Sequence, residues 1–132
     1  MQKLLSDTWN ERKKEMFFDK EVKYSRKSFW NDDVTNYYDK NGRKIGSSRK
    51  SLWNDDKTVY YDENGKKVGT SRRSLWNEDR TDYYDDSNEK TGYSRKSLWD
   101  DGSVNYYDRN HHKTGRSRKS LLDEDKTIYK KR

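Results

Sequence analysis

Apolar residues recur along this chain at a fixed interval of 23 residues. A tryptophan occupies the same place in four successive copies, and a pair of tyrosines follows it on the same period. These positions are Trp30, Trp53, Trp76 and Trp99, and Tyr37–Tyr38, Tyr60–Tyr61, Tyr83–Tyr84 and Tyr106–Tyr107. A fixed period of roughly 20–50 residues is typical of repeat architectures, so one copy describes most of the chain.

Each copy predicts a β-hairpin. Val34–Tyr38 is rich in β-branched and aromatic residues and predicts a strand. We expect Asp39–Arg43 to form a type I turn, with Gly42 in the left-handed conformation and a G1 bulge. A second strand is predicted from Lys44 to Trp53, followed by a second turn at Asn54–Lys57. The other hairpin turns are expected at Asp62–Lys66, at Asp85–Glu89, where Asn88 replaces the glycine, and at Asp108–His112.

The hairpins predict an all-β array, with residues 17–132 forming about five repeats in an elongated, single-sheet antiparallel meander. Residues 1–16 fit the repeat poorly and are interpreted as an N-terminal cap segment. They include Ser6–Thr8, which suit the start of a short helix. An open meander has unpaired edges, and charged residues at an edge block further pairing. Lys130, Lys131 and Arg132 would do so at the C-terminal strand, which predicts a monomer, or at most a dimer formed through the N-terminal region.

Composition changes the view of the core. Leu, Ile, Val and Phe make up only 17 of 132 residues, and 42% of residues are charged, which alone would indicate disorder. Nineteen aromatic residues on a strict period favour an ordered sheet instead, because Tyr and Trp bury large apolar areas. The predicted repeat core is Trp30, Trp53, Trp76, Trp99, Tyr37, Tyr60, Tyr83 and Tyr106. Trp53 and Trp76 lie in interior repeats and are expected to be more buried than Trp9.

Two basic columns follow the Ser-Arg-Lys-Ser element. The predicted register places the arginine column on the face of Tyr37 and pairs it with acids, as Arg49–Asp62, Arg72–Asp85 and Arg95–Asp108. The next residue of each copy falls on the opposite face and has no acid opposite it. The candidate binding surface is therefore this second column together with the basic tail, namely Lys50, Arg73, Lys96, Lys119, Lys130, Lys131 and Arg132.

Charge and candidate chemistry narrow the function classes. The net charge of +7 permits a nucleic-acid or anionic-membrane partner, although 24 acidic residues oppose it. Asp-x-Asn-Gly resembles part of a calcium loop but lacks the remaining oxygen ligands, and His111–His112 have no Cys or further His to join them. No catalytic arrangement is found, so neither a cofactor, a metal nor an enzymatic activity is expected. The chain has no cysteine, and no signal peptide or transmembrane run is found, which favours the cytoplasm.

The motif Tyr-x-Asp-x-Asn-Gly-Lys-x-x-Gly, with the glycine column Gly46, Gly69, Gly92 and Gly115, resembles the MORN repeat and bacterial Tyr-Tyr-Asp repeats. The resemblance covers about residues 17–132. It implies an elongated, grooved antiparallel sheet that acts as a scaffold, dimerises and associates with acidic phospholipids. The chain departs from MORN repeats in having Tyr-Tyr-Asp and a dense Ser-Arg-Lys-Ser element.

From these observations we expect a non-enzymatic repeat scaffold that mediates protein–protein interaction. The alternative is electrostatic binding of nucleic acid or an anionic membrane surface through the basic columns and the aromatic residues. The sequence leaves the identity of the partner open.

Overall fold

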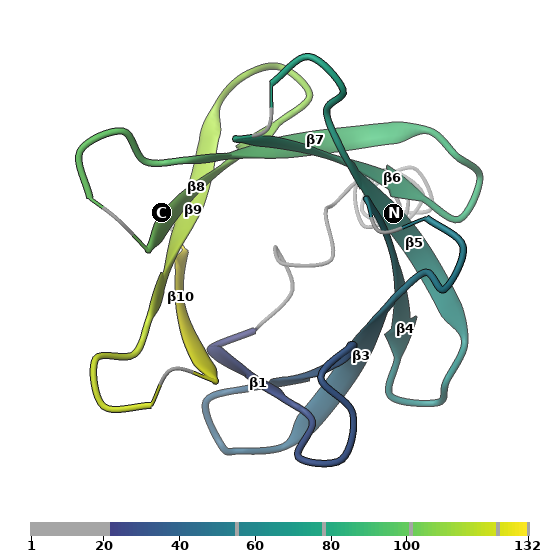
Figure 1. The fold of residues 1–132 in the computed structure, drawn as a ribbon, viewed down its shortest axis with the longest axis vertical. Helices are drawn as coiled ribbons and strands as arrows, with labels where there is room; N and C mark the ends of the chain where they lie inside the picture. The colour runs from purple at the N-terminus through teal and green to yellow at the C-terminus, as the bar shows by residue number, and fades with distance from the viewer. Residues whose placement is uncertain (1–21, 55, 78, 101, 124, 132) are drawn as a thin grey trace, which may run out of the picture.

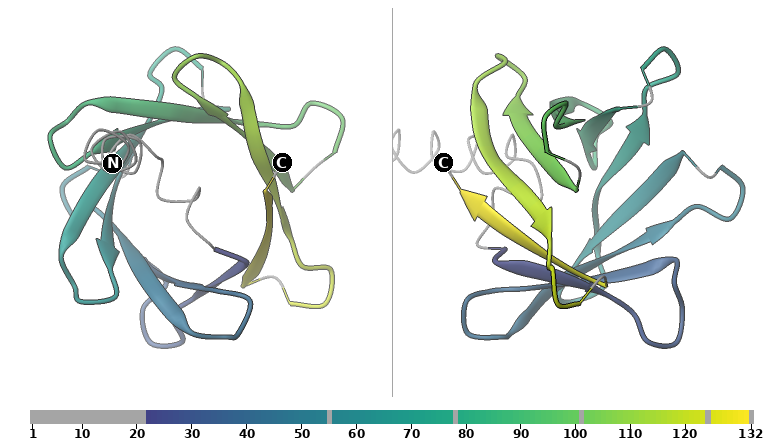
Figure 2. Two further views of the ribbon diagram at one scale, coloured as in Figure 1. Left: turned by 180° about the vertical axis from the view of Figure 1, so that it is seen from behind. Right: turned by 60° about the vertical axis from the view of Figure 1, so that its left-hand side comes forward.

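The computed structural model describes residues 22–131, except 55, 78, 101 and 124. The described residues form antiparallel strands paired in chain order, and the last strand pairs with the first, which closes a barrel (Figures 1 and 2). The strands are β1 (Tyr24–Lys27), β2 (Val34–Tyr38), β3 (Lys44–Lys50), β4 (Lys57–Asp62), β5 (Lys67–Arg73), β6 (Arg80–Asp85), β7 (Lys90–Lys96), β8 (Ser103–Asp108), β9 (Lys113–Lys119) and β10 (Lys126–Lys131). The all-β hairpin repeat is confirmed, whereas the predicted open meander is wrong.

The closure follows from a constant stagger between repeats. Gly46 pairs with Tyr37 on one side and with Asp62 on the other. Asp62 lies two residues beyond Tyr60, the equivalent of Tyr37, so each repeat advances the register by two residues. Five repeats advance it by ten, and for ten strands this shear corresponds to a tilt of about 35° and a barrel radius of roughly 9–10 Å. The stagger therefore brings β10 beside β1.

The predicted hairpin turns are confirmed. The Gly42 N–H donates to the Asp39 carbonyl at 3.1 Å, and the Asp39 N–H donates to the Arg43 carbonyl at 3.0 Å. Gly42 has a φ of 77°, the left-handed conformation that a type I turn with a G1 bulge requires. Asn88 and His111 adopt the same conformation in the third and fourth hairpins, with φ of 65° and 71°. The same pattern of hydrogen bonds recurs at 62–66, 85–89 and 108–112.

The prediction that the second strand continues to Trp53 is wrong, and the register changes with it. β3 ends at Lys50, which pairs with Thr58, so the register differs from the predicted one by three residues. An odd shift exchanges the faces of a strand. Arg49 therefore lies on the outer face, opposite Val59 and not Asp62. The predicted pairs Arg72–Asp85 and Arg95–Asp108 fail in the same way, since Arg72 lies opposite Asp82 and Arg95 opposite Asn105.

The core is a closed ring of five tyrosines, one from each repeat. Their ring centroids lie 6.2–6.4 Å from those of both neighbours, around the whole barrel. Each phenol group bonds a serine hydroxyl on the next strand at 2.9–3.1 Å. The pairs are Tyr37–Ser48, Tyr60–Ser71, Tyr83–Ser94, Tyr106–Ser117 and Tyr129–Ser25. The predicted core tyrosines are confirmed, and Tyr129 completes the ring.

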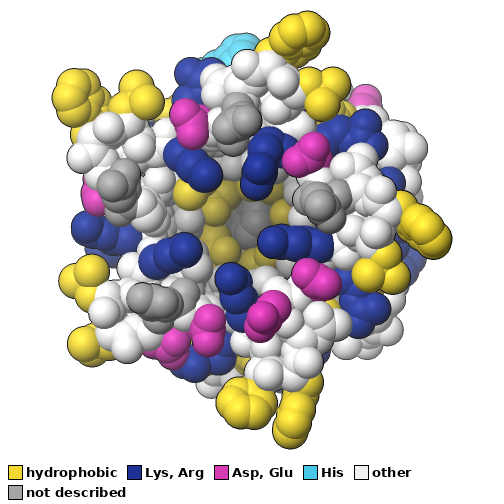
Figure 3. Space-filling model, viewed as in Figure 1, with side chains coloured by type: hydrophobic (Ala, Val, Ile, Leu, Met, Phe, Trp, Pro, Cys, Tyr) yellow, Lys and Arg dark blue, Asp and Glu magenta, His cyan; other side chains and the backbone are white. Residues whose placement is uncertain are grey.

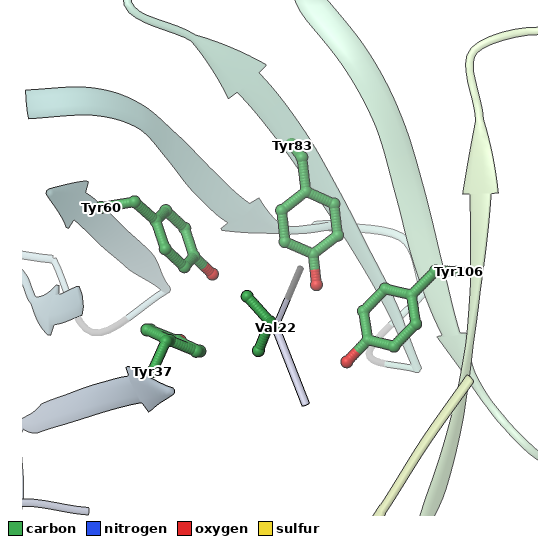
Figure 4. Close-up of a cluster of buried hydrophobic side chains, with 5 residues drawn as sticks. All are labelled: Val22, Tyr37, Tyr60, Tyr83 and Tyr106. Atoms are coloured by element: carbon green, nitrogen blue, oxygen red, sulfur yellow. The ribbon is translucent and has the colours of Figure 1, made fainter. Parts of the chain in front are cut away.

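Val22 fills the centre of the tyrosine ring (Figure 4). A regular pentagon with the observed spacing between centroids would have its corners about 5.4 Å from its centre, because the side is divided by 2 sin 36°. Aromatic rings at this distance leave a narrow axial space. The Val22 side chain is 6% exposed and lies in that space.

The predicted tryptophan core is wrong. Trp30, Trp53, Trp76 and Trp99 are 90–96% exposed. Each lies three residues beyond the end of a strand and therefore in a loop, where the alternation of side chains along a strand no longer directs them inward. Trp9 lies outside the described residues, so the predicted comparison with it stays a prediction.

The C-terminal strand has a hydrogen-bonded neighbour on each side. β10 pairs with β9 through residues that include Lys130 and Lys131, and with β1 on its other side. The predicted role of these lysines in blocking an edge is therefore wrong, because β10 is not an edge strand of the sheet. Arg132, the proposed cap segment 1–16 and its short helix lie outside the described residues.

Candidate functional site

Five loops at one end of the barrel expose apolar side chains to solvent. Each connects an odd-numbered strand to the next and carries two adjacent apolar residues that are 79–99% exposed. We call this set the loop crown: Phe29, Trp30, Leu52, Trp53, Leu75, Trp76, Leu98, Trp99, Leu121 and Leu122. Figure 3 looks onto this end and shows apolar side chains in separate groups around its periphery. Exposed apolar residues scattered singly are normal, whereas here every loop exposes two adjacent ones.

Local hydrogen bonds hold each crown loop in shape. The Ser51 N–H donates to the Lys57 carbonyl at 2.9 Å, and the Lys57 N–H donates to the Asn54 carbonyl at 3.0 Å. The Ser51 hydroxyl accepts from the Trp53 N–H at 3.3 Å, and the Asn54 side chain accepts from the Asp56 N–H at 3.0 Å. Serine and asparagine favour such turns because their side chains bond nearby backbone groups. The hydrogen bonds within each loop thus hold the backbone in the conformation that leaves the crown side chains exposed.

A second set of side chains surrounds the opening at the same end. Ser48 points into the barrel, since its hydroxyl bonds the buried Tyr37, and Lys50 lies two residues further on the same strand. Side chains alternate between faces, so Lys50, the last residue of β3, also lies on the inner face. The equivalent residues of the five repeats are Lys27, Lys50, Arg73, Lys96 and Lys119, which we call the basic mouth. Figure 3 shows basic side chains around a central hollow.

The predicted binding surface is therefore divided. Lys50, Arg73, Lys96 and Lys119 belong to the basic mouth, and Lys27 joins them. Lys130 and Lys131 lie at the end of β10, which runs from the crown to the opposite end of the barrel. Arg132 lies outside the described residues.

Two arginines of the outer column, for which no partner was predicted, form ion pairs. Arg26 pairs with Asp123 at 2.7 Å, and Arg118 pairs with Asp100 at 3.1 Å. Both acids belong to crown loops. Acidic residues thus lie among the basic ones around this end, as Figure 3 shows, so the rim carries both signs of charge.

The tyrosine ring beneath the mouth is a neutral floor. Burial raises the pKa of Tyr129 to about 12 and raises the pKa values of Tyr37 and Tyr83 well above their ordinary value of 10.0. Repulsion among the phenolates adds to the shift of Tyr37, and the serine hydrogen bonds oppose it. The hydroxyl groups therefore remain protonated at neutral pH and serve as hydrogen-bonding groups of the core.

In the turns at the other end of the barrel, an aspartate carboxylate accepts hydrogen bonds from backbone N–H groups of the same turn. The Asp108 carboxylate accepts from the Asn110 N–H at 2.8 Å and from the His112 N–H at 2.9 Å. Burial alone would raise the pKa of Asp108, but these two N–H groups and the His112 ring together lower it. This is the geometry of an Asx turn. Among the described residues, no group of three or more His, Cys, Asp or Glu is placed to hold a metal ion.

Sequence reasoning missed the loop crown, although a signal for it was present. Each apolar pair is flanked by a serine before it and by Asn or Asp after it, as in Ser51-Leu52-Trp53-Asn54. Both flanking types favour turns, which indicates a loop in place of the end of a strand. Lys27 was also missed, although it stands in the same Ser-Arg-Lys-Ser element as the predicted members of the column.

Comparison with known proteins shows the fold alone. No family model matches the chain, and no curated protein is significantly similar to it. An X-ray structure of an Arabidopsis thaliana protein is similar with a TM-score of 0.51 and 15% identity, over 82% of this chain and 78% of that chain. A mutant of S. aureus TarM, crystallised with fondaparinux, alpha-GlcNAc-glycerol and UDP, covers 94% of this chain but 23% of its own, with 13% identity. Its TM-score of 0.26 is too low to support any inference.

No helix among the described residues meets the length and apolarity needed to cross a bilayer.

Proposed function

We propose that the protein is a non-enzymatic docking module that attaches to the surface of a lipid bilayer by inserting its loop crown. The observation that carries this proposal is the 90–96% exposure of Trp30, Trp53, Trp76 and Trp99 in loops held open by their own hydrogen bonds. Tryptophan prefers the interface between headgroups and acyl chains, because its ring is apolar and its N–H can still bond.

The arrangement of the crown favours a bilayer over a protein partner. Its apolar pairs stand apart on a ring and do not form one continuous patch (Figure 3). A protein would need a separate recess for each loop, whereas a bilayer accepts several side chains at once without a matching shape. Protein binding was the first expectation from sequence. One argument still supports it, because tryptophan is enriched among the hot-spot residues of protein interfaces.

The magnitude is sufficient for reversible attachment. Full burial of one large apolar side chain contributes about 1.5–3 kcal/mol. Partial insertion that contributes about 1 kcal/mol per loop would sum to about 5 kcal/mol over the five loops, or a partition ratio of a few thousand. Because the rim carries both acids and bases, we expect this attachment to depend weakly on salt.

Vesicle co-sedimentation tests the proposal. The wild-type chain is expected to bind vesicles of phosphatidylcholine, alone or mixed with phosphatidylserine, with a blue shift of tryptophan fluorescence. The double variant Trp53→Ser/Trp76→Ser is expected to lose at least about tenfold of the partition ratio, since two of five loops no longer insert. Tyr84→Ser, an aromatic replacement on the outer wall of the barrel, serves as the matched control and should bind like the wild type.

Two outcomes would contradict attachment by insertion of the loop crown. A protein that stays in solution with both vesicle types does not insert its crown, and a protein partner would then take the place of the bilayer. Binding only to phosphatidylserine, with a steep decrease as salt rises, would instead support the electrostatic alternative. In that case the crown double variant would bind as well as the wild type.

A further inference from the structure

The basic mouth gathers five cations on the inside of the barrel, one from each repeat. Each lies two residues beyond a serine whose hydroxyl bonds a buried ring tyrosine, at 2.9–3.1 Å. That serine points inward, so the residue two positions later does so as well. The register of the closed barrel sets the position of these basic residues and repeats it five times. The basic mouth is therefore a regular feature of the fold and not an irregular cluster of surface charge.

The geometry lets these side chains converge. A barrel radius of roughly 9–10 Å, from ten strands with a shear of ten, brings the tips of long basic side chains close to the barrel axis. Lys50 pairs with Thr58 and Arg73 pairs with Thr81, so threonines lie on the same inner layer. Figure 3 shows the resulting opening, with basic side chains around a central hollow.

Two of the five arginines in the outer basic column have carboxylate partners. On the outer face, Arg26 and Arg118 form ion pairs with loop carboxylates. Within the part of the chain that the structure describes, none of the five mouth residues forms an ion pair. Like charges held this close repel one another, and an anion on the axis would relieve the repulsion of all five together.

The donors at the mouth select the chemistry of the anion. Lysine and arginine side chains carry only donors, and threonine hydroxyls of the same layer add further donors. Phosphate groups offer several strong acceptor oxygens and more negative charge in a small volume than carboxylates. An extended nucleic acid would instead contact the outer rim, where carboxylates of the crown loops would repel its phosphates.

We propose that the basic mouth binds a compact, multiply phosphorylated anion of the inositol polyphosphate class, with its phosphates directed toward Lys27, Lys50, Arg73, Lys96 and Lys119. The neutral tyrosine–serine floor limits how deeply the anion enters. This site is independent of the loop crown, because it uses the inner face of the strands and no crown side chain.

Titration calorimetry with inositol hexakisphosphate tests the site. The wild-type chain should bind it with roughly one-to-one stoichiometry, and inorganic phosphate should bind far more weakly. Lys50→Gln/Lys96→Gln is expected to weaken binding by at least about tenfold, because two of five converging charges are lost. Arg49→Gln/Arg95→Gln removes the same amount of charge from the preceding residue of the same two strands. These residues lie on the outer face, so the affinity should change less than about twofold.

Contrary outcomes and two further arms assign the result. Equal losses in the two double variants, or no binding by the wild type to any probe, would overturn the proposal. Vesicles that carry a phosphorylated inositol headgroup test the lipid-borne source. Binding to these vesicles but not to the soluble anion, with the same dependence on Lys50 and Lys96, would assign the mouth to a headgroup. Trp53→Ser/Trp76→Ser should keep its affinity for the soluble anion, so failure of crown docking is distinguishable from failure of this site.

Discussion

Replacing Tyr83 by phenylalanine tests the hydrogen-bonded core ring. The Tyr83 hydroxyl bonds the Ser94 hydroxyl at 2.9 Å, and the two residues are 7% and 4% exposed. Tyr83→Phe keeps the ring contacts but leaves the Ser94 hydroxyl buried without this partner. An unsatisfied buried hydroxyl costs about 1–3 kcal/mol, so we expect the free energy of unfolding to fall by about 2 kcal/mol.

A double-mutant cycle separates the bond from other effects of the substitution. Ser94→Ala should cost a similar amount, since it leaves the Tyr83 hydroxyl without its serine. Tyr83→Phe/Ser94→Ala removes both groups and should cost clearly less than the sum of the single variants, by about 1 kcal/mol or more. Tyr84→Phe, the neighbouring residue on the outer face, is the control and should stay within about 0.5 kcal/mol of the wild type.

Urea unfolding followed by circular dichroism provides these free energies, provided that the slopes of the transitions agree among the variants. Additive costs in the double variant would refute the proposed pairing. A loss in Tyr84→Phe as large as that in Tyr83→Phe would mean that the inner and outer faces have been assigned wrongly.

Three other predictions follow from exposure, titration and close packing. Trp76→Ala should change the free energy of unfolding by less than about 0.5 kcal/mol, as is usual for an exposed residue, whereas a buried tryptophan would cost about 3–5 kcal/mol. The raised pKa of Tyr129, about 12 against 10.0, stabilises the fold fully below pH 10, and this contribution is lost as pH rises toward 12. In an alkaline titration the ring tyrosines should therefore ionise together with loss of near-ultraviolet circular dichroism, and ionisation of all eleven in a folded barrel would contradict this. In urea unfolding, Gly69→Ala should destabilise the barrel by about 1–3 kcal/mol, because its Cβ would lie 2.4 Å from the Tyr84 carbonyl oxygen. Gly65→Ala should cost about 1 kcal/mol, because the site has open space but a φ of 80°. A larger cost for Gly65→Ala than for Gly69→Ala would contradict this close packing.

The hairpins could be predicted from sequence because their turns are encoded locally. Asp39, Asn41 and Gly42 supply the side-chain acceptor and the left-handed residue that the turn needs, and the structure has both. The tyrosine core could be predicted for a related reason, since a strand of β-branched and aromatic residues has one face to bury. These features depend on a few adjacent residues.

Barrel closure could not be predicted because it depends on a sum over the whole chain. A bulge between Tyr37 and Tyr38 adds one residue to each hairpin, and the loop after Lys50 sets the pairing with the next. The predicted register, which differs by three residues across that loop, placed Arg49 on the face of Tyr37 and Lys50 on the opposite face, so the inward position of the Lys50 column was not predicted. The same error extended the strand to Trp53 and placed it in the core.

Closure between β1 and β10 can be measured with a disulfide, because the chain contains no cysteine of its own. Arg26 lies opposite Lys126 in a pair without direct backbone hydrogen bonds, since Lys27 donates to Asp125 on one side of it. Such pairs have Cα atoms about 4.5 Å apart, within the range that a disulfide spans. In an open meander the same strands would lie at opposite edges, about 40 Å apart.

Arg26→Cys/Lys126→Cys should therefore form an intramolecular disulfide on mild oxidation in dilute solution and remain a monomer on a non-reducing gel. Arg26→Cys/Arg80→Cys places the second cysteine at the equivalent residue of β6, across the barrel, and should not form the bond. Failure of the first pair to cross-link within one chain, while both variants stay folded by circular dichroism, would contradict the closed barrel. The tyrosine ring and the basic mouth both depend on that closure.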